Sequence, residues 1–196
     1  TQKQELASLW IIKQALGQQG IKYQTVDQLK NDADGYKELR EIYPEVNELW
    51  LKGLVQQQIT VRNHILGGGH YTTFNRDGGF MDFISNLVRT KFKISKKDSW
   101  NPADIWVIKN EQLTIEKIKN AVRGNHPTIT ELNNVMKRLW YDKELKGISL
   151  KAVSGETALW EEVNLDDSLF EDKNSPPIFE IAGSICKLNL KNNNYP

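Results

Sequence analysis

The sequence predicts an α/β or α+β fold, in which a small central mixed sheet is flanked by helices and the N-terminal third is nearly all helix. Apolar residues recur at helical spacing through residues 5–17 and again through residues 44–65. Two short runs rich in β-forming residues, 104–108 and 146–153, are separated by two helical patterns. The chain of 196 residues suits one hydrophobic core, so we expect a single domain over residues 1–196.

The helices follow from apolar stripes and from the residues that bound them. Pro44 is predicted in the first turn of the long helix, where its missing N–H costs nothing, and glycines 67–69 end that helix. Thr130 is a candidate cap for the last helix. We expect helices at residues 5–17, 36–42, 44–65, 80–92, 114–122 and 130–143.

Three segments are predicted to build the central sheet. They are residues 103–108, 146–153 and 157–163, the last two as a hairpin. Residues 71–74 are compatible with a further short strand. An acidic loop over 166–177 follows the hairpin, and 178–190 reads as either extended or helical.

The composition limits the classes of function. The net charge is only +1, so any contact with nucleic acid must come from a local patch. The single cysteine, Cys186, excludes an internal disulfide framework and fits a reducing compartment. No apolar run approaches the roughly 20 residues of a membrane span, so no membrane partner is expected.

Two charged residues stand in the predicted buried strands. Asp104 begins one apolar run, and Lys151 lies inside another. Charges on neighbouring buried strands are costly unless they meet each other or a metal ion. Ser149 is two residues before Lys151, so within a strand the two side chains point to the same face.

Asp104 together with Ser149-x-Lys151 resembles the PD-(D/E)xK nuclease superfamily. The resemblance implies hydrolysis of phosphodiester bonds in DNA with Mg²⁺ or Mn²⁺ as cofactor. It makes Asp104 the first acid, Lys151 the catalytic lysine and Glu5 the glutamate of the first helix. Ser149 stands where the superfamily usually has its second acid, and Glu161 or Glu162 would replace that carboxylate as a metal ligand.

Three stretches of the chain are also similar to uncharacterised proteins of large tailed bacteriophages: Gln4-Glu5, residues 100–106 and residues 148–151. That similarity implies a protein of the host-cell cytoplasm or of the virion. It also implies assembly as a homo-oligomer or within a virion.

Basic residues near the end of the helix at 80–92 are candidates for DNA binding. The group formed by Arg89, Lys91, Lys93, Lys96 and Lys97 is either a solvated helix end or a contact to DNA phosphates. Arg76 precedes Asp77 and two glycines, and is either part of a salt-bridged turn or part of a substrate groove.

Each proposed catalytic residue also has a structural interpretation. Asp104 can be a strand-start residue that binds a nearby backbone amide, Lys151 can protect an edge strand, and Glu5 can be a solvated acid at a helix start. The alternative function is therefore a non-catalytic virion structural or DNA-associated protein with a nuclease-like fold. Convergence of two or more carboxylates beside Lys151 would separate the enzyme from this alternative.

Overall fold

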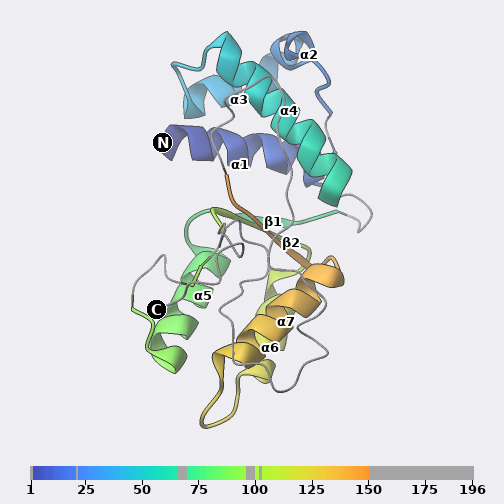
Figure 1. Cartoon of the computed structure of the whole chain (residues 1–196). Coiled ribbons are helices and arrows are strands. Elements are labelled where there is room, and N and C mark those ends of the chain that lie inside the picture. The colour runs from blue at the N-terminus through green and yellow to red at the C-terminus, as the bar shows by residue number, and fades with distance from the viewer. Residues whose placement is uncertain (1, 21, 66–69, 96–99, 102, 151–196) are drawn as a thin grey trace, which may run out of the picture.

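The computed structural model describes residues 2–20, 22–65, 70–95, 100–101 and 103–150. These residues form three layers, with α1–α4 on one face of a sheet and α5–α7 on the other (Figure 1). The α/β or α+β prediction with a helical N-terminal third is confirmed. In chain order the elements are α1 (Gln2–Leu16), α2 (Val26–Asn31), α3 (Ala33–Ile42), α4 (Glu48–Ile65), β1 (Thr73–Asn75), α5 (Gly79–Phe92), β2 (Ile105–Ile108), α6 (Glu111–Ala121), α7 (Ile129–Tyr141) and β3 (Leu145–Ile148).

The sheet has β2 at its centre, paired antiparallel with β1 on one side and with β3 on the other. Opposite Val107 lie Phe74 of β1 and Lys146 of β3. The sequence predicts a mixed sheet, whereas the described strand pairs are all antiparallel. It also leaves β1 out of the sheet, although β1 is one of its described strands. The predicted hairpin strand 157–163 lies outside the described residues.

Strand β2 is buried on both faces, with all four side chains at 0% exposure. Successive strand residues point to opposite faces. Ile105 and Val107 accordingly pack with the helices of α1–α4, and Trp106 and Ile108 pack with α5–α7. The Trp106 ring meets the ring of Phe80 edge to face, with centroids 5.6 Å apart. The strand therefore contributes two side chains to each of the two hydrophobic cores.

Two residues predicted at helix starts do not have the predicted role, and in both cases a different polar side chain caps the helix. Helix α6 begins at Glu111 and not at the predicted residue 114. Pro44 lies in a turn before α4, which begins at Glu48. Asn47 provides the cap, since its Oδ1 accepts a hydrogen bond from the Trp50 amide at 3.1 Å. Helix α7 is capped by Thr128, not Thr130, in a capping box with Glu131.

Side-chain hydrogen bonds to the backbone hold α4 against the N-terminal segments. Arg62 donates to the carbonyl oxygens of Ala15 at 3.3 Å and Gly20 at 3.1 Å, at the end of α1 where carbonyls lack helical partners. Buried Gln58 accepts the Tyr23 amide at 2.7 Å. These bonds satisfy backbone groups that the helices themselves leave unpaired.

Asp32 carries out two structural tasks in this layer. Its Oδ1 caps α3 by accepting a hydrogen bond from the Gly35 amide at 3.0 Å, and its Oδ2 accepts one from the Tyr23 hydroxyl at 2.5 Å. The Tyr23 hydrogen bond, followed by that from Gly35, lowers the pKa of Asp32 below its ordinary value. Burial and the same bond raise the pKa of Tyr23 above its ordinary value.

We expect Asp32→Ala to lower the free energy of unfolding by about 2 kcal/mol at neutral pH, since it removes a helix cap and a side-chain hydrogen bond. The pKa of Asp32 is lower in the folded than in the unfolded state. Its contribution is therefore complete above the ordinary Asp pKa and is lost as pH falls through the lowered value. Denaturant titrations from neutral to acidic pH should show the gap to wild type closing. Asp34→Ala, at an exposed position on the same helix, is the control, and an equal loss in both variants would contradict this assignment.

Candidate functional site

Asp104 lies at the point where the chain enters β2, beside the residue at which β3 ends. Its backbone amide donates to the Ile148 carbonyl at 3.0 Å, which extends the pairing of the two strands by one bond. Its Oδ2 accepts the Ser149 hydroxyl at 3.1 Å and the Leu150 amide at 2.6 Å. The structure therefore brings Asp104 and Ser149 together, as the sequence predicts for neighbouring strands.

The bond from the Leu150 amide is the kind that a strand-start aspartate makes to nearby backbone. Both hydrogen bonds to the carboxylate use Oδ2, and Oδ1 accepts no hydrogen bond from any residue that the structure describes. The half-buried carboxylate thus stabilises the segment leaving β3 and retains one oxygen with the chemistry to bind a cation. The contact supports the structural interpretation of Asp104 and is compatible with the catalytic one.

Several predicted site residues lie outside the described residues. They are Lys151, which directly follows Leu150, and the acids Glu161 and Glu162. Lys96 and Lys97 also lie outside. Their proposed roles as catalytic lysine, metal ligands and DNA contacts remain predictions.

Glu5 is paired with Arg76, which follows β1. The Oε2 atom of Glu5 accepts hydrogen bonds from Nε of Arg76 at 2.8 Å and from Nη2 at 2.5 Å. Arg76 also forms an ion pair with its neighbour Asp77. The hydrogen bond to Glu5 is the largest of the causes that raise the pKa of Arg76 above its ordinary value. The Arg76 guanidinium, predicted as a possible DNA contact, is therefore paired with Asp77 and Glu5. This pairing favours the alternative in which Arg76 belongs to a salt-bridged turn.

The pairing of Glu5 with Arg76 differs from the predicted role of Glu5 as a metal ligand. Glu5 is predicted as a ligand beside Asp104, but its partner in the structure is a cation from the β1–α5 turn. Across residues 2–150, apart from the short gaps already given, no group of three or more His, Cys, Asp or Glu side chains is placed to hold a metal ion.

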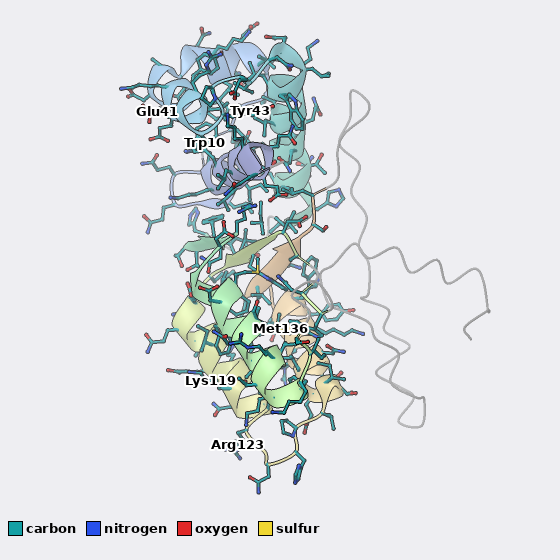
Figure 2. The ribbon with its side chains drawn as sticks, turned by 90° about the vertical axis from the view of Figure 1, so that its left-hand side faces the viewer. Trp10, Glu41, Tyr43, Lys119, Arg123 and Met136 are labelled. Atoms are coloured by element: carbon teal, nitrogen blue, oxygen red, sulfur yellow. The ribbon has the colours of Figure 1, made fainter. Side chains whose placement is uncertain are left out.

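A group of exposed cations without a described acidic partner lies at the end of the molecule remote from α1–α4. Lys119 and Arg123 lie there on and just beyond α6, as Figure 2 shows. The Lys119 ammonium lies 5.7 Å from the ring centroid of Phe83 and so links α6 to α5. With the exposed cations of the last turn of α5 and the residue after it, they form a group that we call the basic end: Arg89, Lys91, Lys93, Lys119 and Arg123.

The basic end is not neutralised within the described part of the chain. None of its members takes part in a described salt bridge, whereas nearby Lys117 is paired with Glu144 at 2.5 Å. Residues 83–95 and 117–130 contain no Asp or Glu. The sequence analysis identified Arg89, Lys91 and Lys93 but missed Lys119 and Arg123. The signal that could have found them is the second acid-free stretch, which a search for local lysine clusters overlooks.

We expect the Glu5–Arg76 ion pair to stabilise the fold because it joins α1 to the β1–α5 turn in a half-buried setting, with 25% and 17% side-chain exposure. A double-mutant cycle of Glu5→Gln and Arg76→Gln should give a coupling energy of about 1–2 kcal/mol in urea unfolding.

The exposed Lys3–Glu45 pair, at 53% and 64% side-chain exposure, is the matched control. Its cycle should give less than about 1 kcal/mol, because solvent screens exposed pairs. Equal coupling in the two pairs would show that burial adds nothing to the Glu5–Arg76 interaction.

No protein-family model matches this chain, and no curated protein or solved structure is significantly similar to it. Among the described helices, none is both long and apolar enough to cross a membrane.

Proposed function

We propose that this protein is a DNA-associated domain that binds the phosphate backbone through the basic end and does not itself cut DNA. The observation that carries the proposal is the collection of five exposed cations, from two helices far apart in sequence, without a described acidic partner. Lysine and arginine side chains that neutralise phosphates release counterions, and this release supplies most of the sequence-independent affinity for DNA.

The net charge of the whole chain is close to zero, so attraction to DNA would depend on a local group of cations. With 26 basic and 25 acidic residues the net charge is +1, so the protein as a whole exerts little long-range attraction on DNA. At the opposite end of the molecule Lys3 is paired with Glu45 and Lys30 with Glu48, while exposed Lys13, Lys37 and Lys52 have no described acidic partner. The basic end differs in its sequence context, because residues 83–95 and 117–130, which carry its cations, contain no Asp or Glu. Such an acid-free surface suits contact with a polyanion.

The engagement of the two described acids supports the non-catalytic form of this proposal. Asp104 accepts two hydrogen bonds that stabilise the end of β3, and Glu5 is neutralised by Arg76. Asp104 and Glu5 therefore each make a stabilising contact that explains their positions without a metal ion.

Removing charge at the basic end should weaken DNA binding equally for unrelated sequences. We expect the Lys119→Gln/Arg123→Gln double variant to reduce the slope of log affinity against log salt by about 1 for each phosphate that the protein no longer neutralises. Fluorescence anisotropy with a labelled duplex over a salt series measures this slope.

The control is Lys3→Gln/Lys30→Gln, which removes the same charge from the opposite end. This variant should bind with the wild-type salt dependence. A similar loss of affinity in both double variants would mean that only net charge matters and that the basic end is not the binding surface.

A metal-dependent nuclease is the second candidate, and one specific contact favours it. The Ser149 and Leu150 bonds to Asp104 place the residues just before Lys151 beside the acid, as the PD-(D/E)xK resemblance requires. In that function Asp104 would hold Mg²⁺ or Mn²⁺, which activates water and offsets charge on the phosphate.

Asp104→Asn separates the two candidates because an amide keeps an oxygen for the Leu150 N–H but loses the charge that binds a metal. Under the non-catalytic proposal, the wild-type protein leaves plasmid and single-stranded DNA intact in Mg²⁺ or Mn²⁺. The variant should also unfold within about 1 kcal/mol of wild type. Metal-dependent cleavage that disappears in Asp104→Asn and Lys151→Ala, with folding retained, would establish the nuclease instead.

A further inference from the structure

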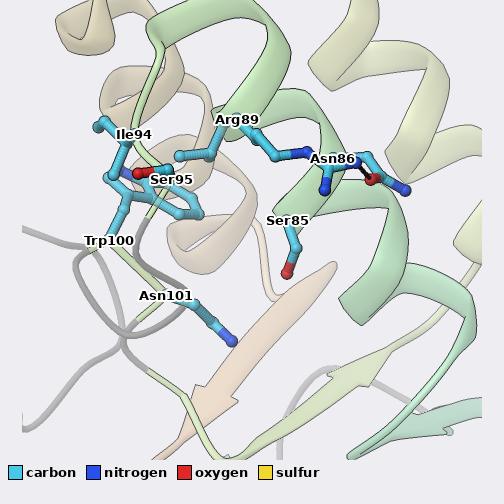
Figure 3. A pocket seen from close by; sticks show the side chains of 8 residues that line it. Ser85, Asn86, Arg89, Ile94, Ser95, Trp100 and Asn101 are labelled. Carbon is cyan, nitrogen blue, oxygen red and sulfur yellow. Dashed lines mark hydrogen bonds between the residues drawn. The ribbon is translucent and has the colours of Figure 1, made fainter.

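A cavity lies beside the basic end, between the C-terminal half of α5 and the segment that leads into β2 (Figure 3). Its volume is about 200 Å³. Exposed Arg89 and Asn86 lie at its rim, and buried Val88 and Trp100 form its floor. The Trp100 indole is fixed there because its Nε1 donates to Asn133 at 3.1 Å.

One polar atom of this cavity is not accounted for by the fold. The Ser85 hydroxyl oxygen is buried and has no hydrogen-bond partner among the described residues. Thr90, on the same helix, satisfies its hydroxyl by donating to the Asn86 carbonyl at 2.7 Å. Buried hydroxyls are normally paired, so Ser85 can accept a partner that the described residues do not supply. Ser85 and Asn101 extend into the space between α5 and the pre-β2 segment in Figure 3.

The charge of the lining indicates which ligands suit the cavity. None of the described residues that line it is acidic, and Arg89 holds a positive charge at the rim, where its Nη2 donates to Asn86 Oδ1 at 2.7 Å. The Ser85 hydroxyl can donate and accept hydrogen bonds, while Trp100 and Ile94 provide apolar walls. Asn101 is held within the protein, since its Oδ1 accepts a hydrogen bond from Trp106 Nε1 at 3.2 Å and its Nδ2 donates to Met81 Sδ at 2.7 Å. A flat ring with polar edges, attached to an anion that stays outside, matches this lining.

We propose that the cavity accepts one unpaired base of a single-stranded nucleic acid whose phosphates lie on the basic end. This inference rests on the proposed function, which it deepens by naming an unpaired nucleotide as the preferred substrate. The cavity is smaller than the roughly 300–1,000 Å³ of sites that enclose drug-sized ligands, so it has room for a ring and not for a whole nucleotide. A base in a duplex is stacked and paired, and only an unpaired base can enter such a pocket.

The first test compares a labelled single-stranded oligodeoxynucleotide with a duplex of the same length by fluorescence anisotropy. Ser85→Leu, which fills the cavity, should weaken single-strand binding roughly 10-fold and leave duplex binding unchanged. Thr90→Leu adds the same side chain to the exposed face of α5 and is the matched control. Equal single-strand affinities for Ser85→Leu and wild type would overturn the proposal.

Ser85→Ala is a second variant that tests the proposal even if Ser85→Leu fails to fold. Removing an unpaired buried hydroxyl should leave the melting temperature unchanged or raise it. The same variant should weaken single-strand binding roughly 3-fold, because its side chain cannot form a hydrogen bond to the base. A lower melting temperature would show that Ser85 has a structural partner, and the proposal would fail.

The second test uses free nucleosides, which carry no phosphate and therefore do not depend on the basic end. At about 10 mM, within the range of weak binding, at least one of the four deoxynucleosides should shift the amide NMR signals of Ser85 and Asn101. Ser85→Leu should abolish those shifts. Shifts without any DNA binding would support the cavity and refute the proposed function. Duplex binding without nucleoside shifts would refute the cavity and leave the proposed function standing.

Discussion

The burial of β2 on both faces is the constraint on which the rest of the structure depends. Its four residues, Ile105–Ile108, contribute alternately to the core under α1–α4 and to the core under α5–α7. Since side chains of a strand alternate between faces, a shift of register by one residue would exchange every contact between the two layers. The strand pairs with β1 and β3, which orders the sheet and fixes where the loops at its ends emerge.

The polar groups at the boundary of the sheet follow from that constraint. A short strand buried on both faces leaves backbone groups at its ends that must be paired. Asp104 binds the Leu150 amide just beyond β3, and Arg76, just beyond β1, binds Glu5 of α1. Both interactions join segments that are distant in sequence. The acids that resemble catalytic groups are thus also the groups that connect the sheet to its surroundings, and this dual use makes their residue types ambiguous as functional signals.

Exposed charges are arranged differently at the two ends of the molecule. Around α1–α4, Lys30 is paired with Glu48 of α4, and Lys3 is paired with Glu45 of the turn before that helix. At the far end of α5 and α6 the described cations of the basic end have no such partner, and the cavity with the unpaired Ser85 hydroxyl lies beside them. The basic end and the cavity both lie in the layer formed by α5–α7, so the proposed contact with nucleic acid would involve that layer.

The sequence by itself determined the features that depend on local pattern. The apolar stripes predicted most helices, and the run Ile105–Ile108 predicted a buried strand with Asp104 at its start, because periodicity and β-propensity act within a few residues. Local pattern did not show that α4 is capped by Asn47 and that Pro44 lies before the helix and not in its first turn. Several nearby residues suit a helix start, and the final fold selects one.

Only the tertiary structure decided which charges meet. Glu5 and Arg76 are 71 residues apart and Lys119 contacts Phe83 on another helix, and neither distance can be read from spacing along the chain. Partner choice for a charged side chain depends on how elements pack, whereas its residue type is all that the sequence shows. The sequence could therefore propose Glu5 as a ligand and Arg76 as a DNA contact, and only packing showed that the two residues bind each other.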